Sequence, residues 1–215
     1  MQSAFQVGAC GNVEIGAQAD HRDRVLSVTR PRPRGYIGTG HQTIGSDILA
    51  LYHALLLPDE VLGTATSSRI RNLDPDGWYP IEDLLEPLEL LGEKLGAAGL
   101  RKVGRKLFEL SHQERVRGVI TSASAIVHGL DGMYRAANRG QDIGGWKVLS
   151  FDAGEARLEK TTPHHCALEE GIVGAAMKMV GVLVNIEQPQ CLRNGRDHCQ
   201  FVITSVVTDV RWTGA

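Results

Sequence analysis

Hydrophobic periodicity divides the chain into a helical first part and a β-rich last third. Apolar residues recur at helical spacing in the segments 46–57, 78–96, 99–110 and 116–137. Ser46 suits the N-cap of the first segment, and Pro58 is expected to end it because proline cannot continue a helix. In the second segment, Pro80 suits the first helical turn and Pro87 is expected to bend the helix. The first part is therefore predicted to consist of amphipathic helices.

After Arg139 the periodicity changes from helical spacing to short alternating runs. The predicted elements are strands 144–151 and 154–162, a helix 169–180, and strands 181–188 and 198–207. The first two strands are separated by Asp152 to Gly154, which is typical of a β-hairpin. The last third is therefore predicted to be a β-β-α-β-β unit.

These elements predict an α+β fold, in which a helical N-terminal half packs on an antiparallel sheet. The chain has 215 residues, which is enough to bury a core without covalent cross-links. Residues 1–40 are rich in Gly, Arg and Pro and are expected to form an arm. Residues 41–215 are expected to form a single domain, with a helical part at 41–139 and the β-β-α-β-β part at 140–208.

Charge and hydropathy limit the classes of partner. The formal net charge is −2, so the chain lacks the basic excess that nucleic acids or anionic lipids usually require. The longest apolar run, 48–57, is much shorter than a membrane span, and the N-terminus resembles no secretory signal. We therefore expect a cytoplasmic protein that binds neither nucleic acid nor membrane. In a reducing compartment, paired cysteines are more often metal ligands or redox groups than disulfides.

Three cysteines are placed so that their thiols can converge. Cys191 and Cys199 lie on the two sides of the turn in CLRNGRDHC, and Cys166 precedes the predicted helix of the last third. Zinc prefers a tetrahedron of four ligands with Zn–S distances of about 2.3 Å, and a hairpin together with a helix entrance can supply that geometry. The alternative is that the cysteines simply fill the core near the hairpin.

The fourth zinc ligand has several candidates. Glu187 is the nearest acidic residue along the strand that precedes Cys191. His164, His165 and His198 are neighbours of the cysteines in sequence and offer imidazole nitrogens.

The last third resembles the 4-vinyl reductase domain family and, more broadly, sensors with the haem-NO-binding fold. The similarity extends over about residues 132–204. It depends on a pattern of glycines, aromatic residues and cysteines: Gly144 or Gly145, Trp146, Val148, Cys166, Gly171, Gly174, Cys191, Gly195, Cys199 and Phe201. The resemblance implies a small-molecule-sensing or accessory domain that holds zinc through three cysteines and a glutamate. The family's acid stands three residues before the middle cysteine, where this chain has Gln188, so we expect a bulge at Pro189 to turn Glu187 inward.

The resemblance also implies how such a site would work. Three thiolates and a carboxylate would close the zinc coordination sphere, which gives the metal a structural role. The ligand would be a hydrophobic or aromatic small molecule in a separate apolar pocket. Trp146 occupies a position similar to that of a pocket tryptophan in phenol sensors, although it could equally pack on the sheet.

Haem is the strongest alternative cofactor, because related folds bind it through a helical histidine. The helical half offers His41, His53, His112 and His128, but the Tyr-x-Ser-x-Arg triplet that holds haem propionates in those sensors is absent. A third possibility is an accessory protein of tetrapyrrole vinyl reduction. The chain shows no nucleotide-binding glycine loop after a strand, so catalysis is not expected. A sensor of this kind would signal as a homodimer or through a partner protein.

Overall fold

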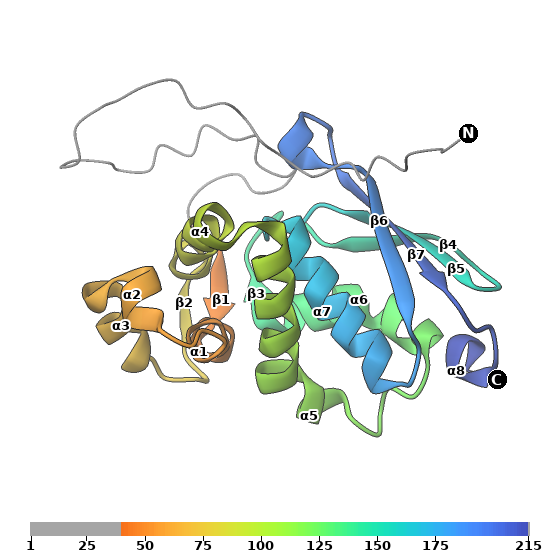
Figure 1. Cartoon of the computed structure of the whole chain (residues 1–215), viewed down its shortest axis with the longest axis horizontal. Coiled ribbons are helices and arrows are strands. Elements are labelled where there is room, and N and C mark those ends of the chain that lie inside the picture. The colour runs from red at the N-terminus through yellow and green to blue at the C-terminus, as the bar shows by residue number, and fades with distance from the viewer. Residues whose placement is uncertain (1–39, 215) are drawn as a thin grey trace, which may run out of the picture.

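The structure, a computed structural model, describes residues 40–214, so the arm expected at 1–40 lies almost entirely outside the described residues. The helices are α1 (Gly45–His53), α2 (Pro58–Leu62), α3 (Thr64–Arg71), α4 (Glu82–Leu107), the π-helical turn η1 (Phe108–His112), α5 (Gln113–Val116), α6 (Ala123–Ala137), α7 (Cys166–Met179), the 3₁₀ turn η2 (Leu192–Asn194) and α8 (Val210–Thr213). The strands are β1 (Gln42–Ile44), β2 (Trp78–Pro80), β3 (Asn138–Arg139), β4 (Trp146–Asp152), β5 (Glu155–Lys160), β6 (Val184–Gln190) and β7 (Cys199–Ser205). This arrangement confirms the predicted α+β fold (Figure 1).

The larger sheet is the antiparallel sheet that the alternating pattern predicted. Its strand order is β4-β5-β7-β6, and α7 connects the β4–β5 hairpin to the β6–β7 hairpin. Figure 1 shows α7 lying across one face of this sheet, with the second half of α4 beside it. The small residues of α7 allow this close approach, and the β-β-α-β-β prediction is confirmed.

A second, smaller sheet was not predicted. Its order is β2-β1-β3, and Trp78 pairs with Ile44 of β1. Trp78 to Pro80 therefore form a strand, whereas the sequence had predicted the first turn of a helix at Pro80. Since β1 is extended up to Ile44, helix α1 starts at Gly45, and Ser46 lies inside the helix rather than at its N-cap.

Helix boundaries differ from the predictions at three further places. The non-helical backbone inside α4 lies at Gly96, where φ is 63°, and not at Pro87, because glycine adopts positive φ at little cost. The predicted helix 116–137 is interrupted, and α6 begins after Ser122, whose hydroxyl accepts a hydrogen bond from the Ala125 N–H at 3.2 Å. Pro58 ends no long helix but occupies the first position of α2.

Helices α4 and α7 pack through two glycines that permit contact between their backbones. A Cβ on Gly104 would lie 2.0 Å from the carbonyl oxygen of Leu168, and one on Gly171 would lie 2.2 Å from that of Arg101. Both separations are far below van der Waals contact, so any larger residue would push the helices apart. This glycine seam, formed by Gly104 and Gly171, fixes the position of α7.

The apolar core has two parts. One cluster joins the larger sheet to α6 and α7, and the other joins α1, α3 and α4 to the first turn of α7. Leu85 and Ile172 pack against both clusters. The boundary between the two clusters therefore runs along the face that α4 and α7 share.

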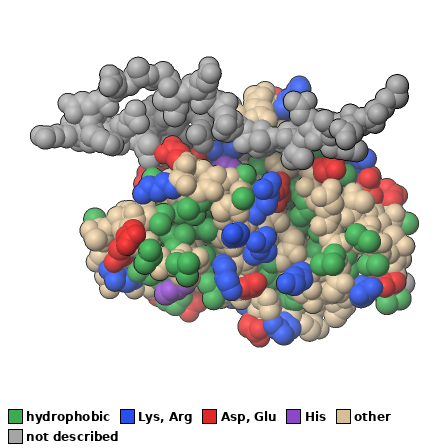
Figure 2. Space-filling model, viewed as in Figure 1, with side chains coloured by type: hydrophobic (Ala, Val, Ile, Leu, Met, Phe, Trp, Pro, Cys, Tyr) green, Lys and Arg blue, Asp and Glu red, His purple; other side chains and the backbone are tan. Residues whose placement is uncertain are grey.

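The surface of the second half of α4 is basic. Figure 2 shows Lys and Arg side chains gathered near the middle of this face. The second half of α4 contains four exposed basic residues: Arg101, Lys102, Arg105 and Lys106. Arg101 pairs with Glu170 of α7, and Lys106 pairs with Glu109, which is typical of a solvated helix face. In the part of the chain that the structure describes, no helix has both the length and the apolar character of a membrane span.

Candidate metal centre and ligand cavity

The structure brings the three predicted cysteines together. The Sγ atom of Cys166 lies 3.1 Å from that of Cys199 and 3.6 Å from that of Cys191, and the latter two are 3.9 Å apart. All three side chains are buried, and none forms a disulfide. Ligands about 2.3 Å from a tetrahedral zinc ion lie about 3.8 Å from one another. The three sulfurs therefore have nearly the spacing of three corners of such a tetrahedron.

Each thiol is positioned by a different element. Cys166 is the first residue of α7, Cys191 follows β6, and Cys199 begins β7. The turn η2 folds back between the two strands, and the N–H of Leu192 donates a hydrogen bond to the Cys199 sulfur at 3.2 Å. A backbone N–H directed at sulfur is a common stabilising contact of a bound thiolate.

Without a metal, the pKa of one thiol of the cluster is raised. Hydrogen bonding with Cys166 and Cys191, together with burial, raises the pKa of the Cys199 thiol above its ordinary value. A metal that binds here would displace the thiol protons, so its affinity would increase with pH.

Lys160 is a buried cation beside the cysteines, and the sequence analysis did not single it out. It is 1% exposed, and its Nζ donates a hydrogen bond to the His164 carbonyl at 2.6 Å and lies 3.6 Å from the Cys166 sulfur. Burial alone would lower the pKa of Lys160, but attraction to Cys166, Glu169 and Cys199 raises it. Lys160 therefore carries a positive charge next to the three sulfurs.

The structure does not bring Glu187 to the cysteines. The expected bulge is present, because the β6–β7 register shifts between Glu187 and Gln190. Glu187 is nevertheless exposed, and its carboxylate accepts a hydrogen bond from Asn185 at 3.1 Å. Gln188, at the position of the family's acid, donates a hydrogen bond to Glu170.

The three histidines considered as the fourth zinc ligand do not join the three sulfurs either. Within residues 40–214, the group of metal-binding atoms that lie within 4.8 Å of one another here contains the cysteines without a histidine or an acid. His165 accepts a hydrogen bond from the Ala167 N–H and caps α7, and burial, together with repulsion from Arg193, lowers its pKa to about 4. His164 points away into the core, and His198 is half-buried in the hairpin turn.

A small cavity lies at the boundary between the two parts of the core. Its volume is about 50 Å³. It is lined by side chains of α1, α4, η1, α6, α7 and the neighbouring strands: Asp47, Leu84, Leu107, Phe108, His112, Leu130, Met133, Tyr134, Ala137, Asn138, Trp146, His164, Leu168, Glu169 and Ile172. The lining is therefore mainly apolar with a few buried polar groups, as is usual for a small-molecule site.

One polar pair of the cavity joins α1 to η1. The Nε2 atom of His112 lies 3.3 Å from Asp47 Oδ1, and Ser111 donates a hydrogen bond of 2.6 Å to the same oxygen. Burial alone would raise the pKa of Asp47, but His112 and Ser111 lower it. Burial would likewise lower the pKa of His112, but Asp47 raises it. The two groups thus form a buried ion pair.

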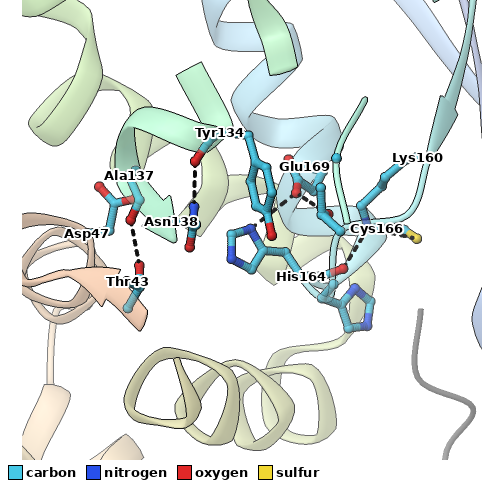
Figure 3. A network of polar contacts seen from close by, with 12 residues as sticks. Thr43, Asp47, Tyr134, Ala137, Asn138, Lys160, His164, Cys166 and Glu169 are labelled. Carbon is cyan, nitrogen blue, oxygen red and sulfur yellow. Dashed lines mark hydrogen bonds and ion pairs between the residues drawn. The ribbon is translucent and has the colours of Figure 1, made fainter. Parts of the chain in front are cut away.

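A second polar group joins the start of α7 to its preceding loop (Figure 3). The Nδ1 atom of His164 lies 3.2 Å from Glu169 Oε1, and Thr162 donates a hydrogen bond to that oxygen at 2.9 Å. Burial would raise the pKa of Glu169, but His164, Lys160 and Thr162 lower it. Glu169 therefore holds the imidazole of His164 in a fixed orientation.

Two polar atoms of the cavity lining are buried without a hydrogen-bond partner: Asn138 Oδ1 and His164 Nε2. Asn138 is 3% exposed and His164 7% exposed. The other end of each side chain is held, because Asn138 donates to the Tyr134 carbonyl at 3.0 Å and His164 contacts Glu169. Buried polar atoms normally have a hydrogen-bond partner, and an ordered water molecule is the usual one where the protein supplies none.

The remaining predicted residues lie in different environments. Trp146 is 8% exposed, lines the cavity and packs edge-to-face on Phe201, so it contacts both the cavity and the sheet. Of the histidines considered for haem, His112 lines the cavity, while His53 and His128 are exposed. His41 is buried, and its Nε2 lies 2.6 Å from the Gln141 carbonyl.

Comparison with known proteins shows the fold but no sequence family. No family model and no curated protein matches the sequence. Among solved structures, an H-NOX protein from S. oneidensis in the Fe(II) ligation state is similar, with a TM-score of 0.60 and 15% identity over 79% of this chain and 99% of that chain. An Fe(II) unliganded H-NOX protein from K. algicida has a TM-score of 0.56 and 10% identity, covering 76% and 97%. An oxygen-binding H-NOX domain related to soluble guanylate cyclases has a TM-score of 0.54 and 13% identity, covering 76% and 93%. The chain therefore has a fold similar to that of H-NOX domains, as the resemblance to haem-NO-binding sensors implied.

Proposed function

We propose that this chain is a small-molecule-sensing domain with a structural metal site. The observation that carries this proposal is the convergence of three buried thiols, at the start of α7, after β6 and at the start of β7, while the cavity is lined in part by His164 and Glu169 from the same end of α7. A metal held by Cys166, Cys191 and Cys199 would attach the β6–β7 hairpin to the start of α7. Because Glu169 and His164 lie at that same start, the metal would also fix one wall of the cavity.

Zinc is the metal that this donor set favours. Three thiolates suit zinc, which has no redox chemistry and accepts tetrahedral geometry. Three thiolates and Zn²⁺ have a combined charge of −1, and the buried ammonium of Lys160 offsets it. The match of Cys166, Cys191 and Cys199 to the 4-vinyl reductase pattern adds support, although that resemblance rests on these residues without a sequence match to the family.

A haem-binding gas sensor is the second candidate, and the fold comparison favours it. The similar structures include an S. oneidensis H-NOX protein in the Fe(II)NO ligation state and an oxygen-binding H-NOX domain. The cavity has a volume of about 50 Å³, whereas pockets for drug-sized ligands have about 300–1,000 Å³. The described conformation therefore does not fit a haem, and His112 is already paired with Asp47.

We propose that the domain passes its signal to a second copy of the chain or to a signalling protein. A homodimer or a signalling protein would be expected to contact exposed apolar residues such as Leu56 and Leu57, which are 99% and 56% exposed. A role as an accessory protein in tetrapyrrole vinyl reduction would use the same metal-stabilised domain. Gel filtration at micromolar concentration distinguishes a monomer from a dimer.

Metal analysis together with an absorption spectrum tests the proposal. The protein is purified without a histidine tag, and the single variants Cys166→Ser, Cys191→Ser and Cys199→Ser are compared with Cys10→Ser. Cys10 is the fourth cysteine of the sequence and lies outside the described residues, so it serves as the matched control. We expect about one zinc per chain in the wild type and in Cys10→Ser, and loss of zinc in the other three.

The spectrum separates the two candidates. Stoichiometric zinc without a Soret band supports the structural metal site. Iron with a Soret band supports the haem sensor and contradicts the zinc proposal. Protein that contains neither metal contradicts both.

A further inference from the structure

We infer that Cys166 and Cys199 form an oxidation site, at which hydrogen peroxide joins the two sulfurs in a disulfide, expels the metal and spares Cys191. This inference deepens the proposed function, on which it rests because it uses the same three thiols. It adds a redox response to a metal site whose role was structural. The oxidant comes from outside the chain.

The spacing of the sulfurs favours one pair. The Sγ atoms of Cys166 and Cys199 are 3.1 Å apart, whereas that of Cys191 lies 3.6 Å from Cys166 and 3.9 Å from Cys199. A disulfide bond is about 2.05 Å long, so the first pair needs a relative movement of only about 1 Å. Each of the three cysteines is free, so each sulfur is available to react.

The reaction balances with one molecule of peroxide. A thiolate sulfur attacks one peroxide oxygen, the O–O bond breaks, and the products are a sulfenic acid and hydroxide. The second sulfur then attacks the sulfenic sulfur, so that the S–S bond forms and the sulfenic oxygen leaves as water. The two sulfurs lose two electrons, which reduce the peroxide to two water molecules, and solvent supplies the two protons. Metal-bound cysteines are already thiolates, the form that reacts, and an oxidised sulfur is no longer a thiolate ligand, so the metal leaves.

Peroxide reaches the buried sulfurs through the turn of the β6–β7 hairpin. The three cysteines are at most 4% exposed, but Cys191 and Cys199 flank residues 194–197, all of which are exposed. This turn is attached to α4 by the ion pair between Arg193 and Glu89. Exposed turns open locally at a much lower free energy than the whole fold, and peroxide is only slightly larger than water. The sulfurs therefore lie directly beneath the part of the hairpin that opens most easily.

The disulfide would change which elements are linked. The metal joins the start of α7, the end of β6 and the start of β7, through Cys166, Cys191 and Cys199 respectively. The disulfide keeps α7 and β7 joined, whereas Cys191 loses its link. The structural response is therefore confined to the end of β6 and to the turn η2, while the α7 side of the site stays in place.

The unfolded chain supplies a matched comparison, because chain entropy favours a different pair. Cys191 and Cys199 are 8 positions apart in the sequence, whereas Cys166 and Cys199 are 33 positions apart. The probability of closing a flexible loop falls with about the 3/2 power of its length, so the unfolded chain should form the Cys191–Cys199 disulfide about eightfold more often than Cys166–Cys199. Only the folded arrangement of the sulfurs reverses this preference.

Peroxide treatment followed by peptide mapping tests the inference. All samples carry Cys10→Ser, so that only the three cluster thiols can react. Zinc-loaded folded protein and protein unfolded in guanidinium chloride with a chelator are treated with hydrogen peroxide. The remaining thiols are alkylated, the linked peptides are quantified by mass spectrometry, and a chromophoric chelator records the zinc released from the folded sample.

In the folded protein we expect Cys166–Cys199 as the main disulfide, alkylated Cys191 and loss of the zinc, and in the unfolded chain the reverse preference of about eightfold. Cys191→Ser should keep the folded-state disulfide, whereas Cys199→Ser should lose it; if a variant does not fold, the comparison of folded and unfolded samples still decides. Folded protein that forms mainly Cys191–Cys199, or that forms no disulfide, overturns the inference.

Zinc measured before peroxide is added tests the proposed function separately. Protein without zinc contradicts the metal site, and the disulfide pairing is still read on that same sample. A Cys166–Cys199 disulfide in zinc-free protein would therefore support the oxidation site while the proposed metal site fails.

Discussion

The glycine seam between α4 and α7 gives a sharp test of how this fold positions the site. Replacing Gly171 with alanine adds one methyl group, whose carbon would lie 2.2 Å from the Arg101 carbonyl oxygen. Gly174 lies three residues further along the same helix, and a Cβ there would meet nothing within 4 Å. Gly174→Ala is therefore a control with the same chemistry in the same helix.

The expected difference follows from two terms. Both substitutions remove a helical glycine, which stabilises the folded state by about 0.5–1 kcal/mol. Only Gly171→Ala forces the helices apart, by roughly 1 Å if normal contact is to be restored, and overpacking of this kind costs about 1–3 kcal/mol. The free energy of unfolding should therefore be about 1–3 kcal/mol lower in Gly171→Ala than in Gly174→Ala. For a chain of this size, that corresponds to a Tm lower by about 2–12 °C.

Calorimetry or thermal circular dichroism measures the two Tm values under identical conditions. A second measurement connects the seam to the metal site: because Cys166 is the first residue of α7, displacement of the helix should accelerate loss of zinc to a chelator in Gly171→Ala and leave Gly174→Ala unchanged. Equal Tm values for the two variants would falsify the reasoning, since the close approach of the backbones would then not exist in solution.

Three further predictions concern the buried charges. Asp47→Asn removes the charged partner of His112, which then loses its proton, so urea denaturation near pH 6 should show a loss of about 1.5–3 kcal/mol; a loss below about 0.5 kcal/mol would contradict the ion pair. The pKa of Asp47 is lowered from 3.8 in the folded protein, so its contribution to stability is present above pH 3.8 and disappears as the pH falls through the pKa of the folded state. The pKa of His112 is raised from 6.5, so its contribution is complete below pH 6.5 and disappears as the pH rises through the pKa of the folded state. The contribution of this pair should therefore be largest between about pH 4 and 6.5, so the stability difference between wild type and Asp47→Asn should be greatest there, and a difference that does not vary with pH would refute this assignment. Lys160→Met should weaken zinc binding about 10-fold or more in a chelator competition, whereas Lys147→Met, at an exposed position, should not, and equal affinities would show that the ammonium does not offset the thiolate charge.

Much of the fold could be predicted because it follows from local periodicity. The β4–β5 hairpin and α7 have clear alternating or helical spacing, and the structure confirms them. The strand Trp78 to Pro80 could not be predicted in this way. It is three residues long and depends on pairing with Ile44, a contact distant in sequence. The break at Gly96 depends on a positive φ, which glycine permits but does not require.

The convergence of the cysteines could be predicted from the turn, but the position of Glu187 was misjudged. Side chains along β6 alternate, and Val184 and Ile186 point toward the interior, so Glu187 points outward. The register shift comes after Glu187, between it and Gln190, and a bulge redirects the residues at and beyond the extra position. The bulge therefore could not turn Glu187 inward, and the strand parity in the sequence already indicated this.

The same parity argument identifies Lys160 as a site residue from sequence alone. Ala156 and Leu158 are buried on one face of β5, and Lys160 continues that face two residues later. A lysine at a buried strand position contradicts the apolar pattern, and such conflicts between residue type and position are expected at functional sites. Strand parity does not identify the groups that Lys160 contacts. Cys199 lies opposite Lys160 because β5 pairs with β7, and Cys166 approaches it from the start of α7. The charge of Lys160 therefore makes the thiol cluster the strongest candidate for an anionic, metal-loaded group in this part of the core.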